Sequence, residues 1–131
     1  MIDINVECKL IVLLGMIFCH IVDDYYLQGI LASMKQKSWW RKQESYNDKY
    51  KYDYVIALIM HAFSWSFMIT IPLLLMKFNL IAILISILIN CVVHAMIDNE
   101  KANKKSINLI QDQCCHLLQI FGTWLIVGLC S

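Results

Sequence analysis

The chain has 131 residues, of which 60% are hydrophobic and only 16% are charged. Soluble domains are nearer half apolar, with about a quarter of their residues charged. The composition therefore argues against a disordered tail, a collagen-like fibre or a small secreted disulfide scaffold. The net charge of +1 gives no indication of nucleic-acid binding. At this length we expect a single domain over residues 1–131.

The cysteines and the N-terminal residues carry no processing signal. None of the six cysteines forms a C-x-x-C pair, and all but Cys8 lie in apolar segments, which predicts small apolar residues in helices. Asp3 and Glu7 stand among the first nine residues, and no small-residue cleavage site follows Phe18. We therefore interpret the N-terminus as a first membrane span rather than a signal peptide.

Four apolar stretches have the length of a membrane span, which is about 20 residues at 1.5 Å rise each. A β-barrel would instead show alternating segments of about ten residues, and the lack of turn residues argues against buried strands. We predict an all-α fold, a polytopic membrane four-helix bundle. Its spans are Leu10–Ala32, Tyr54–Met76, Leu80–Ile97 and Ile107–Cys130.

The basic residues predict the orientation of the bundle. Nine of the eleven Lys and Arg residues lie in two connections, residues 33–53 and 98–106, which four spans place on the same side. The positive-inside rule puts these connections in the cytoplasm. We therefore expect a multi-pass protein of the cytoplasmic (inner) membrane with both termini outside, and with the turn Met76–Asn79 facing out.

The longer connection mixes basic and aromatic residues. The spacing of Trp39, Gln43, Tyr46 and Tyr50 is roughly helical and predicts an interfacial amphipathic segment between the first two spans, with rings at headgroup depth. One interpretation is an anchor that fixes the ends of these spans. The other is a lid or lipid guide over a site.

Each predicted span contains one histidine, and three of the four have an aspartate four residues away. Positions i and i+4 share a helix face, so each pair can converge on one point. The pairs are His20–Asp24, His94–Asp98 and Asp112–His116. These residues and His61 lie in the cytoplasmic halves of the spans, and polar stripes on three spans continue the same faces.

Buried carboxylates in a bilayer need compensation, since a charged Asp at the centre costs about 2.5–3.5 kcal/mol on insertion scales. Imidazole and carboxylate together suit a divalent metal. We expect zinc, with manganese or iron as the alternatives. Four neutral His and three ionised Asp carry a charge of −3, which permits one or two ions. The predicted metal ligands are His20, Asp24, His61, His94, Asp98, Asp112 and His116.

Several neighbouring residues have more than one interpretation. His61 lacks an Asp partner, so an interhelical hydrogen bond is its equal alternative. Asp23 lies about 100° around the helix from Asp24 and is a second ligand, a support for a ligand, or a loop-facing residue. Amides are expected to hydrogen-bond the ligands or other helices: Gln28, Asn90, Gln113 and Gln119. A thiolate ligand is an alternative at Cys91, Cys114 or Cys115. We interpret three lysines as residues that set the membrane orientation, with binding of a lipid headgroup as the alternative: Lys101, Lys104 and Lys105.

These residues fall into motifs: HIVDDYYLQ from His20 to Gln28, His61, HAMIDNEK from His94 to Lys101, and DQCCH from Asp112 to His116. The set resembles a family of small bacterial and phage membrane proteins, domain of unknown function number 3307, with the pattern H-x3-D-aromatic-x2-Q, a central His, H-x3-D-x2-K and D-Q-x2-H. The resemblance covers all four spans. It implies polar positions shared by a family and no reaction. The doubled acid at Asp23–Asp24 departs from the pattern and leaves open which carboxylate is functional.

The function favoured by the sequence is metal-assisted hydrolysis of an amphiphilic or lipid-linked substrate taken from the cytoplasmic leaflet. In this hypothesis Asp23 or Asp98 is the general base, and Lys101 stabilises anionic charge. A loose similarity to membrane-bound metal-dependent hydrolases is an analogy only.

Two alternatives remain open. A proton or metal-ion transporter predicts polar residues that continue to the outer face, whereas residues 67–75 and 80–88 are nearly free of ionisable groups. A non-catalytic phage or bacterial membrane interaction protein predicts a structural metal with no open coordination position. The expected partners are the lipid bilayer and a lipid-linked substrate, with no nucleic acid, and homo-oligomers stay open.

Overall fold

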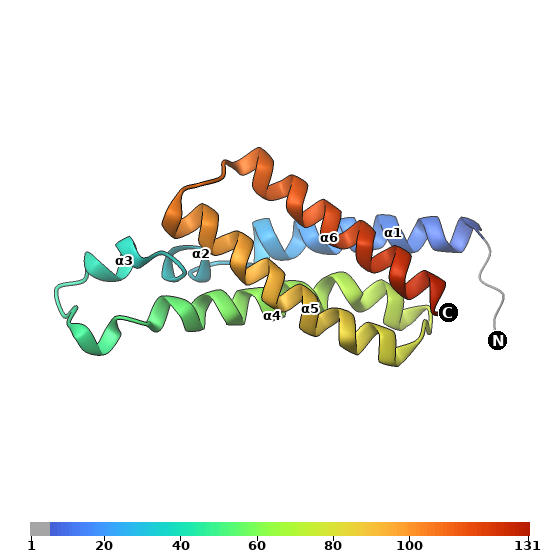
Figure 1. Ribbon diagram of the computed structural model, residues 1–131, viewed down its shortest axis with the longest axis horizontal. Helices are drawn as coiled ribbons and strands as arrows, with labels where there is room; N and C mark the ends of the chain where they lie inside the picture. Colours follow the sequence, from blue (N-terminus) through green and yellow to red (C-terminus); the bar gives the residue numbers. More distant parts are fainter. Residues whose placement is uncertain (1–5) are drawn as a thin grey trace.

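The computed structural model describes residues 6–131, which form four long helices packed lengthwise (Figure 1). The predicted all-α fold is confirmed. The long helices are α1 (Val6–Ile21), α4 (Asp53–Leu75), α5 (Leu80–Asn99) and α6 (Leu109–Leu129). The short elements are η1 (Val22–Leu27), α2 (Leu31–Met34), α3 (Lys37–Arg41), η2 (Asp48–Tyr50) and η3 (Glu100–Lys104). Asp3, used in the argument about the N-terminus, lies outside the described residues.

The bundle has two distinct ends. Helices α4 and α5 form a hairpin, α1 packs on α4, and α6 packs on α5 and α1. The α4–α5 turn lies at one end with the start of α1 and the end of α6, while α2 and α3 lie at the other (Figure 1). We call these the turn end (residues 76–79) and the loop end (residues 28–52 and 100–108).

Local sequence explains where the helices at the turn end stop and start. After α4 the chain adopts a left-handed conformation at Lys77, and Phe78 N–H donates to the Leu73 carbonyl in a Schellman arrangement. Asn79 then caps α5 by accepting a hydrogen bond from the Ala82 amide. At the loop end, Asn108 and Gln111 form a capping box that begins α6.

The interior of the turn end is apolar. Its core includes Met16 of α1, Ile69 and Leu73 of α4, Ile83 of α5 and Val127 of α6, all fully buried. At Gly15 an added Cβ would lie 3.1 Å from the Pro72 side chain, so the glycine lets α1 approach α4 closely. The core of this end is held by apolar packing, and hydrogen bonds from Asn79 to Ser131 and to the Cys130 carbonyl join its surface.

The outer faces of the helices are also apolar. On α5, Leu88, Val92 and Met96 form an exposed stripe at four-residue spacing. Two segments are long and apolar enough to cross a membrane, Asp48–Leu75 and Leu80–Lys104. They contain the second and third predicted spans. Helix α6 reaches 21 residues but carries three Gln, one Asp and one His in its first eleven positions.

The first predicted span, Leu10–Ala32, is wrong as a single helix. Helix α1 ends at Ile21, the chain continues as the π-helix η1, and Gly29 then takes a left-handed φ of +51°. Glycine adopts this conformation at little cost, so it ends the helical run here. Together, the 16 residues of α1 and the 6 residues of η1 form one helical run of at most about 33 Å, which is comparable with the ~30 Å hydrocarbon core.

The segment between the first two predicted spans is not the one continuous helix that the roughly helical spacing suggested, and its interfacial position stays a prediction. The chain is extended at Gln36 and Asn47, which separates α2, the five-residue α3 and the three-residue η2. Trp39 and Tyr50 therefore share no helix face. Local contacts hold the segment instead: the Trp40 indole donates to the Met34 carbonyl at 2.6 Å.

Candidate metal centre

Buried ionisable side chains gather inside the bundle toward the loop end. All seven predicted ligands and Asp23 lie in this cluster, and each is at most 3% exposed except Asp24, whose side chain is 8% exposed. They come from α1, η1, α4, α5 and α6. Each of the four long-helix segments thus contributes at least one imidazole or carboxylate to the same region.

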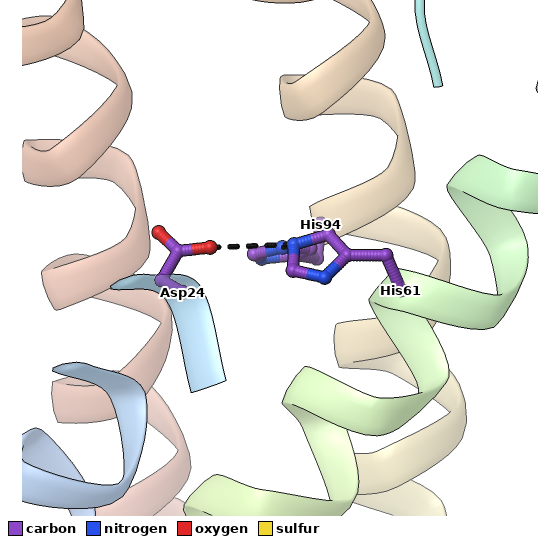
Figure 2. A group of neighbouring side chains, drawn as sticks. All are labelled: Asp24, His61 and His94. Carbon is purple, nitrogen blue, oxygen red and sulfur yellow. Dashed lines mark hydrogen bonds and ion pairs between the residues drawn. The ribbon is translucent and has the colours of Figure 1, made fainter. Parts of the chain in front are cut away.

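One group of three centres on His61. Its Nε2 lies 3.3 Å from Asp24 Oδ1 and 3.2 Å from His94 Nε2. Figure 2 shows Asp24 reaching from η1, His61 from α4 and His94 from α5 toward one another, with ligand atoms within 4.8 Å. We call Asp24, His61 and His94 the first triad.

A second triad consists of His94, Asp98 and His116, and it shares His94 with the first. His94 Nε2 lies 3.8 Å from Asp98 Oδ2, and His116 Nε2 lies 3.6 Å from Asp98 Oδ1. His116 Nε2 also lies 3.3 Å from Asp112 Oδ1. Asp112 therefore adjoins the second triad through its i+4 histidine, as the spacing predicts.

The spacing of donor atoms around His61 suits a bound cation. From its Nε2 the distances are 3.3 Å to Asp24, 3.2 Å to His94 and 3.4 Å to Asp98. Bonds of 2.0–2.1 Å at tetrahedral angles place zinc ligands about 3.3–3.4 Å apart. The separations measured from His61 Nε2 therefore match those between the ligands of a tetrahedral ion, and the ligand atoms of each triad all lie within 4.8 Å of one another.

The doubled acid contacts both sides of one imidazole. Asp24 Oδ1 faces His61 Nε2, while Asp23 Oδ2 lies 3.7 Å from His61 Nδ1 and Asp23 Oδ1 accepts a hydrogen bond from Ser64. In a regular α-helix the two carboxylates would diverge by about 100°. Asp23 and Asp24 both lie in the wider π turn of η1, and both carboxylates point toward His61.

His20 occupies a different position from the other imidazoles. Its Nδ1 accepts a hydrogen bond from the Trp65 indole at 2.8 Å, so its Nε2 carries the proton and donates to Gln113 Oε1 at 3.0 Å. Both ring nitrogens are thus engaged, and His20 belongs to neither triad. Its role as a ligand stays a prediction, and the geometry favours positioning of Gln113.

The amides support the carboxylates. Gln113 donates to Asp24 Oδ2 and to Asp112 Oδ2, both at 3.1 Å, and Gln28 donates to Asp24 Oδ1 at 3.3 Å. Gln119 accepts from His116 Nδ1 at 3.4 Å and donates to Asn90. The expected hydrogen bonds between these amides and the site are therefore present.

Two lysines from the loop end pair with site carboxylates. Lys101 Nζ lies 2.6 Å from Asp112 Oδ2, and Lys35 Nζ lies 2.5 Å from Asp98 Oδ2. Asn103 fixes the second pair by donating to the Lys35 carbonyl. The sequence analysis missed Lys35, because no local spacing links it to a residue 63 positions away.

A tryptophan forms one wall of the cluster. Trp65 stacks on His94 with ring centroids 4.1 Å apart, and His94 stacks on His116 at 4.2 Å. Stacking of this kind fixes ring orientation. Trp65 was also missed, although it lies four residues after His61 and therefore on the same helix face.

The charges of the cluster indicate how many ions it accommodates. With neutral imidazoles, its four carboxylates (Asp23, Asp24, Asp98, Asp112) and two ammonium groups (Lys35, Lys101) leave a charge of −2. One divalent cation neutralises this charge, whereas two would leave an excess of +2. On this count, with neutral imidazoles and no bound hydroxide, one divalent ion matches the charge of the cluster.

Some buried polar atoms lack a hydrogen bond. Among the described residues these are Asp23 Oδ2, His94 Nδ1, Asp112 Oδ1 and His116 Nε2. A buried unsatisfied group costs about 1–3 kcal/mol. Three of the four belong to residues in or beside the second triad, so this part of the cluster has donor atoms to offer a cation.

A cleft of about 480 Å³ leads from the loop end to the cluster. Asp24 and Asp98 reach it from the triads, and Gln113 lines it between them. Its cationic lining residues are Lys35, Lys101 and Lys105. Asp23 and His61 do not line it, so they lie behind the carboxylates that face the opening.

The thiols lie apart from the ligand atoms. Neither triad of the described residues contains a cysteine. Cys91 Sγ contacts the Ile59 carbonyl at 4.0 Å, and Cys114 is exposed. The structure therefore gives the thiolate alternative no support.

Lys104 pairs with Glu100 on the surface and lies outside the cluster.

Comparison with known proteins gave one match. A family model described as "Protein of unknown function (DUF3307)" matches residues 12–130. No curated protein and no solved structure matches the chain.

Proposed function

We propose that this protein, whose residues 12–130 make it a member of the DUF3307 family, is a metal-dependent hydrolase embedded in the membrane. Its substrate is amphiphilic or lipid-linked and is taken from the cytoplasmic leaflet. The observation that carries the proposal is the first triad. Its His61 Nε2 lies 3.3 Å from Asp24 Oδ1 and 3.2 Å from His94 Nε2, and Asp24 lines an open cleft.

In this proposal Asp24, His61 and His94 hold one divalent ion. Two imidazoles and a carboxylate suit zinc and also accommodate manganese or iron. Three protein ligands would leave a fourth position open, and a divalent ion held there would supply a water activated for nucleophilic attack near neutral pH. Asp23 Oδ2 lies 3.7 Å from His61 Nδ1, where its negative charge favours the tautomer with the proton on Nδ1, so that Nε2 is free to coordinate.

The proposed catalytic groups line the cleft. Asp98, 3.4 Å from His61 Nε2 and held by Lys35, accepts the proton of the attacking water as general base. Lys101, whose side chain is 37% exposed, stabilises anionic charge on the substrate. Asp23 stands behind His61 and outside the cleft, which favours Asp98 over Asp23 as the base.

The membrane part of the proposal rests on the exterior. Helices α4 and α5 are long and apolar enough to cross, and exposed apolar faces on α1 and α6 continue the same surface. We propose four crossings in the inner membrane, with the basic loop end in the cytoplasm. The cleft then opens at the level of the cytoplasmic headgroups.

The test separates metal binding from turnover. Zinc-loaded and chelator-treated protein in detergent is assayed against a phospholipid, an isoprenoid phosphate and a lipidated peptide. We expect hydrolysis of one of them only with metal. Asp98→Asn should keep the zinc and lower turnover by about 10²–10⁴-fold. The matched control is Glu100→Gln, which removes a surface carboxylate two residues away and should not change the rate. Folded protein that takes up no divalent metal would refute the proposal.

A second candidate is transport of protons or a metal ion. It is favoured by hydrogen bonds that continue from His116 through Gln119 and Asn90 to Thr123, toward the turn end. Beyond them the interior is closed by Ile83 and Val127. Flux across proteoliposomes without hydrolysis would select this candidate, and four closed protein ligands without flux would select a structural metal.

A further inference from the structure

A second cavity adjoins the candidate metal centre on the lipid-facing side. It measures about 530 Å³ and lies between α6 and the stretch where α1 passes into η1. We call its apolar walls the α1–α6 seam, defined by Ile17, Ile21, Tyr26 and Leu117. Ile21 and Tyr26 are exposed, so the seam opens on the outer face of the bundle.

The seam and the cleft are neighbours. Tyr25 and Gln113 line both cavities. Gln113 also donates to Asp24 Oδ2 at 3.1 Å, which places the junction beside a member of the first triad. A molecule that occupied both cavities would therefore pass directly over this carboxylate.

The two cavities differ in chemistry. The seam cavity is lined mainly by aliphatic and aromatic side chains together with His20. The cleft is lined by Lys35, Lys101 and Lys105 and by the carboxylates of Asp24 and Asp98. The first two lysines already pair with Asp98 and Asp112. Lys105 makes no ion pair with any described residue, so its charge is available to an incoming anion.

Apolar walls that lead into a cationic cleft are complementary to an anionic amphiphile. A hydrocarbon chain gains contacts along the seam, and a phosphate headgroup gains charge-assisted hydrogen bonds from lysine. A neutral amphiphile would leave Lys105 unpaired, and a free anion would leave the seam unfilled.

We infer that the α1–α6 seam binds the hydrocarbon chain of a lipid phosphate whose headgroup lies in the lysine-lined cleft. This inference rests on the proposed function, since it names the substrate class of the same site. The chain enters sideways from the bilayer between α1 and α6, and the bond between chain and headgroup lies beside Asp24, Tyr25 and Gln113.

The experiment measures binding without requiring hydrolysis. Purified protein in detergent is mixed with dodecyl phosphate, dodecanol or inorganic phosphate, with zinc or with chelator, and bound molecules are counted by native mass spectrometry. We expect retention of dodecyl phosphate above both other probes. Leu117→Trp, which fills the seam, and Lys105→Gln should each weaken it about tenfold. Leu118→Trp is the control, because Leu118 is 70% exposed and lines neither cavity.

The outcomes are separable. The inference about the seam is overturned if the Leu117→Trp and Leu118→Trp variants retain equal amounts of dodecyl phosphate. It is also overturned if the protein retains dodecanol and dodecyl phosphate equally. Seam-dependent retention without metal-dependent hydrolysis confirms the binding site and refutes the hydrolase. Metal-dependent hydrolysis that is unchanged by Leu117→Trp supports the hydrolase and refutes the seam.

Discussion

The two ends of the bundle are built from the same helices by different means. Toward the turn end, α4 and α5 bury Ile69, Leu73 and Ile83 in an apolar core. Toward the loop end, the same two helices bury His61 and His94 among carboxylates. The helices are continuous, so the apolar end can supply rigidity while the polar end keeps groups that would not pack stably alone.

The two ends also differ in the interactions that their buried side chains require. Apolar side chains at the turn end need only close contact, whereas the loop end needs lysines, amides and a π-helix to arrange its charges. The polar end is still incompletely paired. If a cation pairs with the remaining polar atoms, substitutions at the loop end should abolish metal binding, whereas substitutions at the turn end should lower the free energy of unfolding.

The largest expected effect is that of His94→Ala. His94 belongs to both triads, so its removal should abolish stoichiometric metal binding, as measured by elemental analysis of purified protein. Ser86→Ala is the control, because it changes a buried polar residue of the same helix at the turn end. Retention of a full equivalent of zinc in the His94 variant would contradict the shared-ligand arrangement.

Next is Ile69→Ala, at the other end of the comparison. Removing this fully buried side chain should lower the free energy of unfolding by about 2–5 kcal/mol through the cavity that it leaves. Unfolding is followed in detergent by circular dichroism against denaturant. Zinc per folded molecule should stay unchanged, and a matching loss of zinc would show that the two ends are not separable.

A smaller effect is expected at Asp23→Asn. The variant keeps the hydrogen bond from Ser64 but loses the charge behind His61 Nδ1, so zinc affinity should fall about 10–100-fold. Competition with a fluorescent zinc chelator gives the dissociation constant, and Glu44→Gln is the exposed control. Unchanged affinity would indicate that Asp23 serves only to hold Ser64.

The smallest effects come from two glycines. Gly29 has a φ of +51°, and an added Cβ would meet nothing closer than 3.8 Å, so Gly29→Ala should cost about 1 kcal/mol through backbone strain alone. Gly122 lies within α6 with open space around it, so Gly122→Ala should add up to ~1 kcal/mol. Thermal unfolding should show a lower melting temperature for Gly29→Ala and a higher one for Gly122→Ala than for the unchanged protein.

The sequence predicted what depends on local pattern. The second span was placed within one residue of α4 at each end, because the apolar run begins and ends abruptly. The gathering of the imidazoles and acids followed from i,i+4 spacing, which fixes a helix face. Hydropathy says nothing of helical winding, so η1 and the break at Gly29 were absent from the predicted first span.

Contacts between distant parts of the chain could not be predicted in this way. The pairing of Lys35 with Asp98 depends on how the α2 segment folds back, and Asn103 takes part in that fold. The engagement of both His20 nitrogens depends on Trp65 and Gln113 from two other helices. These contacts arise from tertiary packing, which one sequence without aligned relatives does not encode in any spacing.

The π-helix η1 has a consequence for how the chain tolerates length changes. A π turn accommodates one more residue than an α turn over the same rise. Deleting a single residue from 22–27 would let the segment rewind as ordinary helix and turn one of its two acids away from His61. A one-residue deletion in η1 would therefore change the charge of the site while leaving the remainder of the bundle in register.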